Sequence, residues 1–211
     1  TRDVRENWQN VPPPDMPDWM MINSIEINPF EKGGAYVAGT RYKMGDYQPY
    51  LYKTSDYGNT WTRINNGIDN SHFTRVVRAD PERQGLLYAG TETGMYISFD
   101  DGASWKPFQM NLPVVPVTDL TIKDNNLIVA TQGRSLWMID DLTPLHQLNS
   151  EVAAAKAHLF KPLKSYRMGG YGGRESKTAG TNHPGGVMVH FYLDSEPDSA
   201  TDIALEFRET D

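Results

Sequence analysis

An eight-residue pattern that occurs twice constrains the fold of this chain more than any other feature. Residues 54–61 and 98–105 both read Ser/Thr-x-Asp-x-Gly-x-Ser/Thr-Trp, and their aspartates lie 44 positions apart. Self-similarity at such a period is typical of solenoids and β-propellers. The shared positions are Thr54, Asp56, Gly58, Thr60 and Trp61 in the first copy and Ser98, Asp100, Gly102, Ser104 and Trp105 in the second.

The segments that flank the two patterns repeat as well. Short runs of β-branched and aromatic residues alternate with Asn, Asp, Gly and Pro, at 24–27, 35–38, 75–79, 87–89, 117–122 and 127–131. This alternation predicts strand, turn and strand. A third strand precedes each aspartate turn and a fourth begins at each tryptophan, which makes four short strands per unit, as in a propeller blade. We therefore predict an all-β chain in which residues 20–140 form about three four-stranded blades of an incomplete β-propeller.

The third unit lacks the end of the pattern. Residues 136–139 are followed by Asp-Asp-Leu-Thr-Pro at 140–144, without Gly-x-Ser/Thr-Trp. A last blade without its outer strand is what closure of a ring by an N-terminal strand requires. Propellers have about four to eight blades, so we expect the remaining blades to come from the parent chain or from another subunit. The chain starts without Met and ends in a strand-like run, and we expect it to be a fragment of a longer protein.

We predict three regions along the chain. Residues 1–141 hold the C-terminal blades of the propeller, 142–186 a short helix and a Gly-rich linker, and 187–211 the first strands of a truncated β-sandwich. Asn149 or Ser150 is expected to cap the helix, with Glu151 in its first turn. The glycines between 169 and 186 indicate the linker. The runs 187–193 and 203–208 predict the opening hairpin of the sandwich.

Composition excludes several classes of function. With 27 acidic and 20 basic residues the net charge is −7, so the chain lacks the basic surface that nucleic acid requires. The absence of cysteine excludes disulfides, thiolate metal sites and a cysteine nucleophile. No run approaches the roughly 18 apolar residues of a membrane span. We predict neither a cofactor nor a metal, because the five histidines show no ligand spacing: His72, His146, His158, His183 and His190.

We interpret the two aspartate turns as folding devices. Their glycines supply a positive φ, and their aspartates accept backbone N–H groups of the same turn. The tryptophans are expected to wedge between neighbouring sheets. A catalytic or calcium-binding role is the alternative. Adjacent carboxylates such as Asp100 and Asp101 fall short of the roughly six to eight oxygens that Ca²⁺ takes.

The loops at the opposite end of the blades form the candidate binding face. Residues 40–47 form a longer loop than 91–94 or 131–134, and their arginine, aspartate and tyrosines suit recognition of a glycan or a peptide. One alternative is a set of ion pairs that closes the tunnel mouth. Another is a carboxylate pair of Asp46 and Glu92 for glycoside hydrolysis, whose separation would decide the mechanism. The candidate ligand-binding residues are Arg41, Tyr42, Asp46, Tyr47, Glu92, Gln132 and Arg134, and no catalytic residue is assigned.

The two patterns resemble the BNR or Asp-box repeats of sialidases, xyloglucanase-type glycoside hydrolases and sortilin-type receptors. The similarity is greatest to large secreted bacterial proteins of the "glycosyl hydrolase, BNR repeat" or sortilin-like type, and it covers roughly residues 7–165. It implies further blades upstream and an immunoglobulin-like domain downstream. The chain departs from that family at Thr118 and Gln132, where histidine is usual, so chemistry resting on those histidines is absent. The arginine triad of sialidases, with its Tyr, Glu and Asp, has no counterpart that we can place in this chain.

We therefore predict part of a secreted or cell-surface Asp-box propeller protein, which serves as a glycan- or protein-binding module or scaffold. The alternative is part of a sialidase- or xyloglucanase-like glycoside hydrolase, with catalytic residues largely outside this segment. A purely structural subunit is a third possibility. The resemblance implies a protein that is secreted, periplasmic or on the surface of a bacterium.

Overall fold

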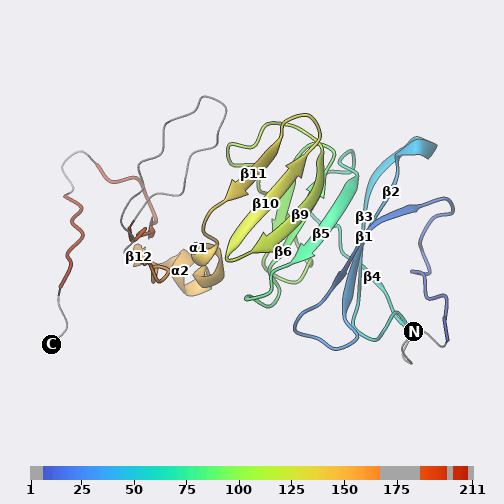
Figure 1. Ribbon diagram of the computed structural model, residues 1–211, viewed down its shortest axis with the longest axis horizontal. Helices are drawn as coiled ribbons and strands as arrows, with labels where there is room; N and C mark the ends of the chain where they lie inside the picture. The colour runs from blue at the N-terminus through green and yellow to red at the C-terminus, as the bar shows by residue number, and fades with distance from the viewer. Residues whose placement is uncertain (1–6, 167–185, 199–201, 209–211) are drawn as a thin grey trace. The chain divides into compact units, whose positions relative to one another are not determined.

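The computed structural model describes residues 7–166, 186–198 and 202–208, and the chain divides into two units, Thr1–Asp141 and Leu142–Asp211. The predicted all-β class with four-stranded blades is confirmed, because the first unit consists of antiparallel sheets that lie side by side (Figure 1). The first sheet has the order β1 (Met21–Ile27), β2 (Ala35–Arg41), β3 (Asp46–Thr54) and β4 (Thr62–Arg63), with a 3₁₀ helix at Tyr42–Met44. The second sheet has the order β5 (Thr74–Ala79), β6 (Leu87–Thr91), β7 (Met95–Ser98) and β8 (Lys106–Pro107).

The third sheet has three strands, β9 (Val117–Lys123), β10 (Asn126–Thr131) and β11 (Leu136–Ile139), with β10 in the middle. Every neighbouring pair in the three sheets is antiparallel, and consecutive strands pair with each other. This up-and-down order is that of a propeller blade. Among the described residues the third blade has no counterpart of β4 and β8, the fourth strands of the other two.

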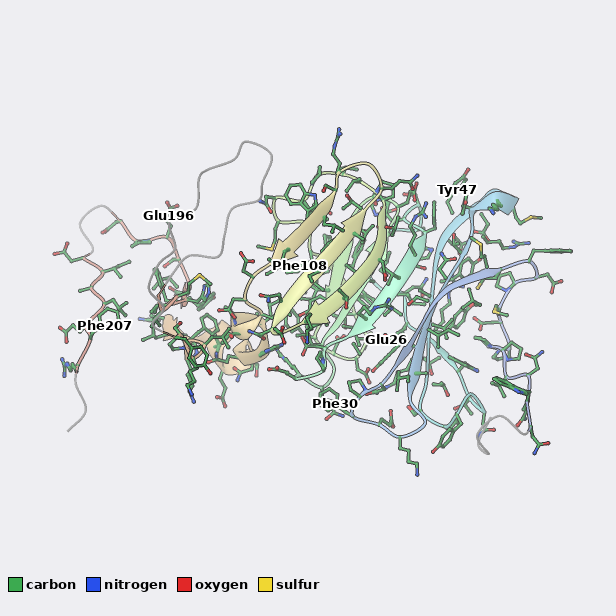
Figure 2. All side chains as sticks on the ribbon, in the orientation of Figure 1. Glu26, Phe30, Tyr47, Phe108, Glu196 and Phe207 are labelled. Carbon is green, nitrogen blue, oxygen red and sulfur yellow. The ribbon has the colours of Figure 1, made fainter. Side chains whose placement is uncertain are left out.

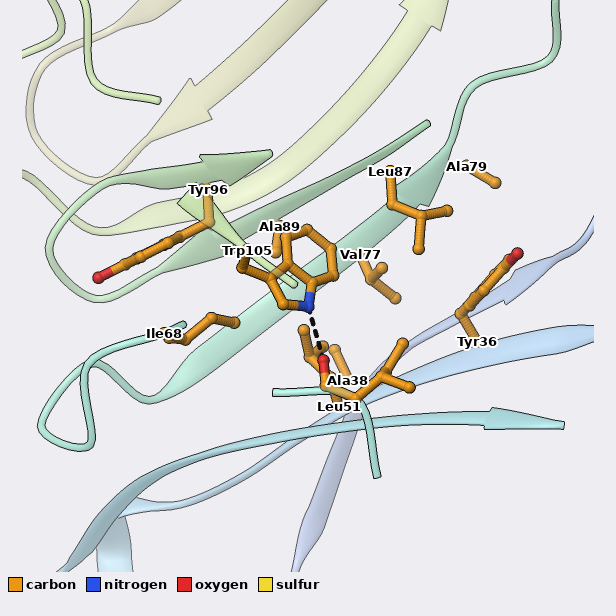
Figure 3. Close-up of a cluster of buried hydrophobic side chains, with 11 residues drawn as sticks. Tyr36, Ala38, Leu51, Ile68, Val77, Ala79, Leu87, Ala89, Tyr96 and Trp105 are labelled. Carbon is orange, nitrogen blue, oxygen red and sulfur yellow. Dashed lines mark hydrogen bonds between the residues drawn. The ribbon is translucent and has the colours of Figure 1, made fainter. Parts of the chain in front are cut away.

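The first two blades pack through a shared apolar core. Tyr36, Ala38 and Leu51 of the first blade meet Val77 and Trp105 of the second (Figure 3). The Trp105 indole donates a hydrogen bond to the carbonyl of Ile64, 2.6 Å away, so its polar atom is satisfied inside the core. Because each fully buried large apolar side chain contributes about 1.5–3 kcal/mol, this interface holds the two blades together.

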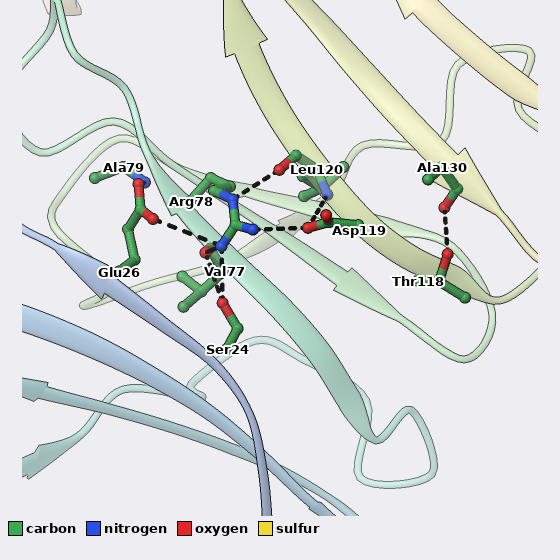
Figure 4. Close-up of polar contacts among 9 residues, drawn as sticks. All are labelled: Ser24, Glu26, Val77, Arg78, Ala79, Thr118, Asp119, Leu120 and Ala130. Carbon is green, nitrogen blue, oxygen red and sulfur yellow. Dashed lines mark hydrogen bonds and ion pairs between the residues drawn. The ribbon is translucent and has the colours of Figure 1, made fainter.

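Arg78 connects the inner strands of all three blades (Figure 4). From β5 it donates to the Ser24 hydroxyl of β1 at 2.8 Å and to the Leu120 carbonyl of β9 at 2.7 Å. It also pairs with Glu26 at 3.5 Å and with Asp119 at 2.7 Å. A single guanidinium can serve so many acceptors because it carries five N–H donors.

Each aspartate turn is closed by its own hydrogen bonds. Asp56 accepts the backbone N–H of Thr60 at 2.8 Å, the Thr60 hydroxyl at 2.7 Å and the Thr54 hydroxyl at 2.9 Å. Asp100 accepts the matching three bonds from Ser104 and Ser98, at 2.8, 2.5 and 2.8 Å. The aspartates therefore act within their own turns.

The two turn aspartates should make stability depend on pH in acid. The Thr60 donors lower the pKa of Asp56. Burial raises the pKa of Asp100, but the donors from Ser104 and Ser98 outweigh it and the net shift is downward. Both carboxylates thus stabilise the fold fully above the ordinary value of 3.8, and this contribution is lost as the pH falls through their lower folded-state values. We expect the melting temperature to fall less between pH 6 and pH 3 in the Asp56→Asn, Asp100→Asn double variant than in the unmodified chain. Equal falls in the two proteins would contradict this assignment.

The second unit contains α1 (Thr143–Gln147), α2 (Ser150–Ala154), β12 (Ala157–Leu159) and β13 (Phe191–Leu193). Asn149 caps α2, since its side chain accepts the N–H of Val152 at 2.8 Å. The glycines at 169–173 and His183 lie outside the residues that the structure describes.

The predicted hairpin of 187–193 with 203–208 is wrong. Only Phe191–Leu193 forms a strand, and its antiparallel partner is β12, which lies in the region that we assigned to helix and linker. Residues 202–208 form no strand, and their alternating apolar residues Ile203, Leu205 and Phe207 are exposed, so no second layer covers them there. The β-sandwich remains a prediction.

Candidate binding site on the loop face

The connections between strands lie at two opposite ends of each blade. At one end the aspartate turn meets the β1–β2 or β5–β6 turn: the N–H of Tyr57 donates to Gly33, and that of Asp101 to Gly85, at 2.9 and 2.8 Å. At the other end the β2–β3, β6–β7 and β10–β11 loops lie beside the connections between blades. We call this end the loop face. Figure 2 shows Tyr47 on the loop face and Phe30 at the opposite end of the first sheet.

An aromatic–arginine cluster, defined as Tyr42, Tyr47, Phe73, Arg75 and Glu92, occupies the loop face between the first two blades. The rings of Tyr42 and Phe73 stack with centroids 5.1 Å apart and planes 12° apart, and the Tyr47 ring lies 6.1 Å from Phe73. The Arg75 guanidinium lies 5.3 Å from the Phe73 ring centroid and 5.9 Å from that of Tyr42, within cation–π range. Phe73 is buried, whereas Tyr47 is 54% exposed, so this ring is available to a ligand.

Glu92 is held by Arg75. The Glu92 carboxylate accepts from the Nε of Arg75 at 2.6 Å, and the Nη2 atom of Arg75 lies 2.5 Å from the same oxygen. The backbone N–H of Glu92 donates to the Phe73 carbonyl at 3.1 Å, which ties the β6–β7 loop to the start of β5. The ion pair therefore fixes the guanidinium beside the stacked rings of Tyr42 and Phe73.

Asp46 is held in a separate set of contacts within the first blade. Its carboxylate accepts the Tyr50 hydroxyl at 2.7 Å and the N–H of Gln48 at 3.1 Å, and it pairs with Arg41 at 3.4 Å. Burial raises the pKa of Asp46, but these donors outweigh it and leave that pKa below the ordinary value. A glycosidase general acid needs the opposite shift.

The geometry therefore suits recognition better than acid–base catalysis. Each carboxylate is matched to its own arginine, and among the described residues no contact joins Asp46 to Glu92. The ion pairs at this end are Arg41–Asp46 and Arg75–Glu92. The Tyr47 ring lies near these ion pairs and is accessible.

The structure brings together some predicted residues and leaves others apart. Tyr42, Tyr47 and Glu92 share the cluster, and Arg41 and Asp46 lie beside it. Gln132 and Arg134 are exposed on the β10–β11 loop, and within the described ranges neither side chain contacts the cluster. Our sequence reasoning missed Phe73 and Arg75. Their signal was an aromatic residue and an arginine two positions later, at the start of an inner strand that follows a loop of the binding face.

In the part of the chain that the structure describes, no group of three or more His, Asp or Glu residues is placed to hold a metal ion. None of the helices in these same residues has the length and apolar character needed to cross a membrane.

Comparison with known proteins gives structural likenesses only. No protein-family model and no curated protein matches the chain. Among solved structures it is similar to a GH74 enzyme from Niastella koreensis, at 14% identity and a TM-score of 0.44, over 57% of this chain and 21% of that one. It is similar to the GH74 xyloglucanase from Xanthomonas campestris at 17% identity and a TM-score of 0.42, over 57% of this chain and 22% of that one. YCF48 bound to D1 peptide matches at 17% identity and a TM-score of 0.42, over 57% of this chain and 37% of that one. The chain thus matches well under half of each structure's length, and the likeness concerns the fold alone.

Proposed function

We propose that this chain is a non-catalytic recognition module of an Asp-box propeller protein, which binds a glycan or a peptide on the loop face. The observation that carries the proposal is the aromatic–arginine cluster. The exposed Tyr47 ring packs beside Phe73, and the Arg75 guanidinium, fixed by its ion pair with Glu92, lies against the Phe73 and Tyr42 rings. Aromatic rings offer a flat apolar face to a sugar or a side chain, and fixed charges orient a bound group.

The hydrolase alternative has weaker support. The lowered pKa of Asp46 keeps that carboxylate ionised at neutral pH, and Glu92 is engaged by Arg75. Neither group is therefore prepared to donate a proton to a leaving group. A location outside the cytoplasm, secreted or at the cell surface, belongs to this proposal because it follows from the family that the sequence resembles.

The Tyr47→Ala variant tests the proposal. The chain should bind at least one member of a panel of neutral oligosaccharides, sialylated oligosaccharides and peptides in a surface-based binding assay. Loss of a single aromatic contact of about 1–1.5 kcal/mol should then weaken that binding about fivefold to tenfold.

Tyr57→Ala is the matched control, because Tyr57 is also an exposed tyrosine but lies in the aspartate turn, at the opposite end of the blade. Its binding should equal that of the unmodified chain. Equal losses in the two variants, or no binding to any member of the panel, would contradict a binding site on the loop face.

A further inference from the structure

Residues 8–11 resemble the segment at the end of β4. In both, a tryptophan is followed three residues later by a β-branched residue: Trp8-Gln9-Asn10-Val11 matches Trp61-Thr62-Arg63-Ile64, where β4 ends and the chain crosses to the second blade. The indole of Trp105 donates to the carbonyl of Ile64 at 2.6 Å, and the indole of Trp61 donates to the carbonyl of Val11 at 2.9 Å. Val11 thus has the same position relative to the first blade as Ile64 has relative to the second.

The glycines of the two aspartate turns show the same correspondence. A Cβ atom added to Gly102 would lie 2.6 Å from Ile64 Cδ1, and one added to Gly58 would lie 2.8 Å from Val11 Cγ2. Both glycines have a positive φ, +85° and +83°. Two independent contacts therefore place Val11 where the chain would leave the fourth strand of a preceding blade, and residues 8–10 lead into it at the position of that strand.

One face of the first blade would meet this preceding blade, and we call it the front face. It is apolar and exposed. Ser24 and Glu26 point to the second blade, so Ile25 and Ile27 point the other way. Their equivalents in the second blade are Val77 and Ala79, which are buried against the first blade. Ile25 and Ile27 are instead 68% and 76% exposed.

An open cavity of about 1020 Å³ lies on the front face, lined by residues of the 7–13 segment and by the apolar side chains of β1.

The buried Tyr52 hydroxyl on the front face also lacks the hydrogen-bond partner that its equivalent in the second blade has. In the second blade the Tyr96 hydroxyl bonds to Nδ1 of His72, in the segment that arrives from the first blade, at 2.8 Å. The equivalent hydroxyl of Tyr52 is buried and has no hydrogen-bond partner among the described residues. The junction on the front face is thus less complete than the junction between the first two blades.

The third blade lacks what residues 8–10 supply. It has three strands, and the outer edge of β11 has no paired strand among the described residues. On its back face, the side away from the second blade, Leu136 and Met138 are 69% and 55% exposed. The residues at the same register positions of the second blade, Met95 and Ile97, are buried.

We propose that the occupant of both ends is a second copy of this chain. Residues 8–10 of one copy add to β11 of the other and complete its third blade, whose back face then covers Ile25 and Ile27. At each contact one copy supplies the missing strand and the other supplies the apolar face that covers its partner's front face. The contact is head to tail, of the kind that closes rings.

The register of the added strand follows from the two complete blades. Lys53 pairs with Thr62 in the first blade, and Ile97 pairs with Lys106 in the second. Counting from the tryptophans, Gln9 occupies the place of Thr62 and Lys106. Met138 occupies the place of Lys53 and Ile97, so Gln9 of one copy should lie opposite Met138 of the other.

Cross-linking can test this register sharply because the full chain contains no cysteine. Full-length Gln9→Cys and Met138→Cys proteins, mixed under mild oxidation, should form a disulfide-linked heterodimer. The matched control is Thr62→Cys mixed with Met138→Cys: Thr62 is exposed but already belongs to a paired fourth strand. We expect at least tenfold more heterodimer from the first mixture than from the second.

Light scattering on the chain without cysteines provides the second readout. The unmodified chain should associate head to tail as its concentration rises, and the Ile25→Glu variant should remain monomeric while keeping its circular dichroism spectrum. A monomer at all concentrations, together with equal cross-linking in the two mixtures, would overturn the proposal. That result would mean that a blade from another stretch of polypeptide, not a second copy of this chain, covers the front face.

Discussion

Replacement of Trp105 by alanine is expected to lower the free energy of unfolding by about 3–5 kcal/mol, a large part of the stability of a small domain. The side chain is 3% exposed and lies in the core between the first two blades. Its loss leaves a cavity there and also leaves the carbonyl of Ile64 without its donor. Urea unfolding followed by circular dichroism gives the difference directly.

Two comparisons make the Trp105 prediction specific. Trp105→Phe should cost less than Trp105→Ala, since most of the packing is retained. Trp61→Ala removes the equivalent tryptophan from a partly exposed site against the N-terminal segment, and should also cost less. Equal losses at Trp61 and Trp105 would contradict a core concentrated between the first two blades.

Replacement of Arg78 by alanine is expected to lower the free energy of unfolding by about 2–3 kcal/mol at pH 7. The guanidinium makes charge-assisted hydrogen bonds to Ser24, Leu120 and Asp119, and through them it joins β1, β5 and β9. Its loss also leaves the carboxylate of Glu26 half-buried without its cation.

The pH dependence of the Arg78→Ala variant follows from Glu26. Burial raises the pKa of Glu26, and the charge of Arg78 offsets part of that rise. Without Arg78 the folded-state pKa should rise further above the unfolded value. Such a group favours the fold below its unfolded pKa, and this contribution is lost as the pH rises through its folded pKa. The stability loss should therefore be larger at pH 7 than at pH 4.5, as measured by urea unfolding at both values.

A double variant isolates the part that Glu26 plays. Arg78→Ala with Glu26→Gln removes the unpaired carboxylate, so it should recover part of the stability at pH 7 and show less dependence on pH. If the loss were the same at both pH values and the second substitution gave no recovery, the half-buried carboxylate would not be its cause.

The repeats allowed much of the first unit to be predicted from sequence. The Ser/Thr, Asp and Gly positions are fixed by hydrogen bonds within one turn, so an eight-residue pattern is enough to specify the turn and the strands beside it. The missing fourth strand of the third blade was visible for the same reason, because no tryptophan follows Asp141 at the expected spacing.

The cluster on the loop face was only partly predictable. Tyr42, Tyr47 and Glu92 lie in or beside the loops of the candidate binding face. Phe73 instead directly precedes β5 and Arg75 lies within it, so in the sequence both belong to the alternation of a strand. Their role depends on contacts between blades, which no local pattern reports. The strand partner of Phe191–Leu193 was missed on similar grounds, since an edge can pair with any nearby extended segment and the chain offered two.

The most direct test of a recognition module that does not hydrolyse its ligand measures binding and turnover on the same sample. The oligosaccharide bound most tightly in the panel, or failing that each oligosaccharide of the panel, would be incubated with the chain and its products separated by chromatography. We expect the oligosaccharide to be recovered intact, while the Tyr47→Ala variant weakens whatever binding the panel shows. Hydrolysis that disappears in the Glu92→Gln or Asp46→Asn variant would contradict the account and assign an active site to the loop face.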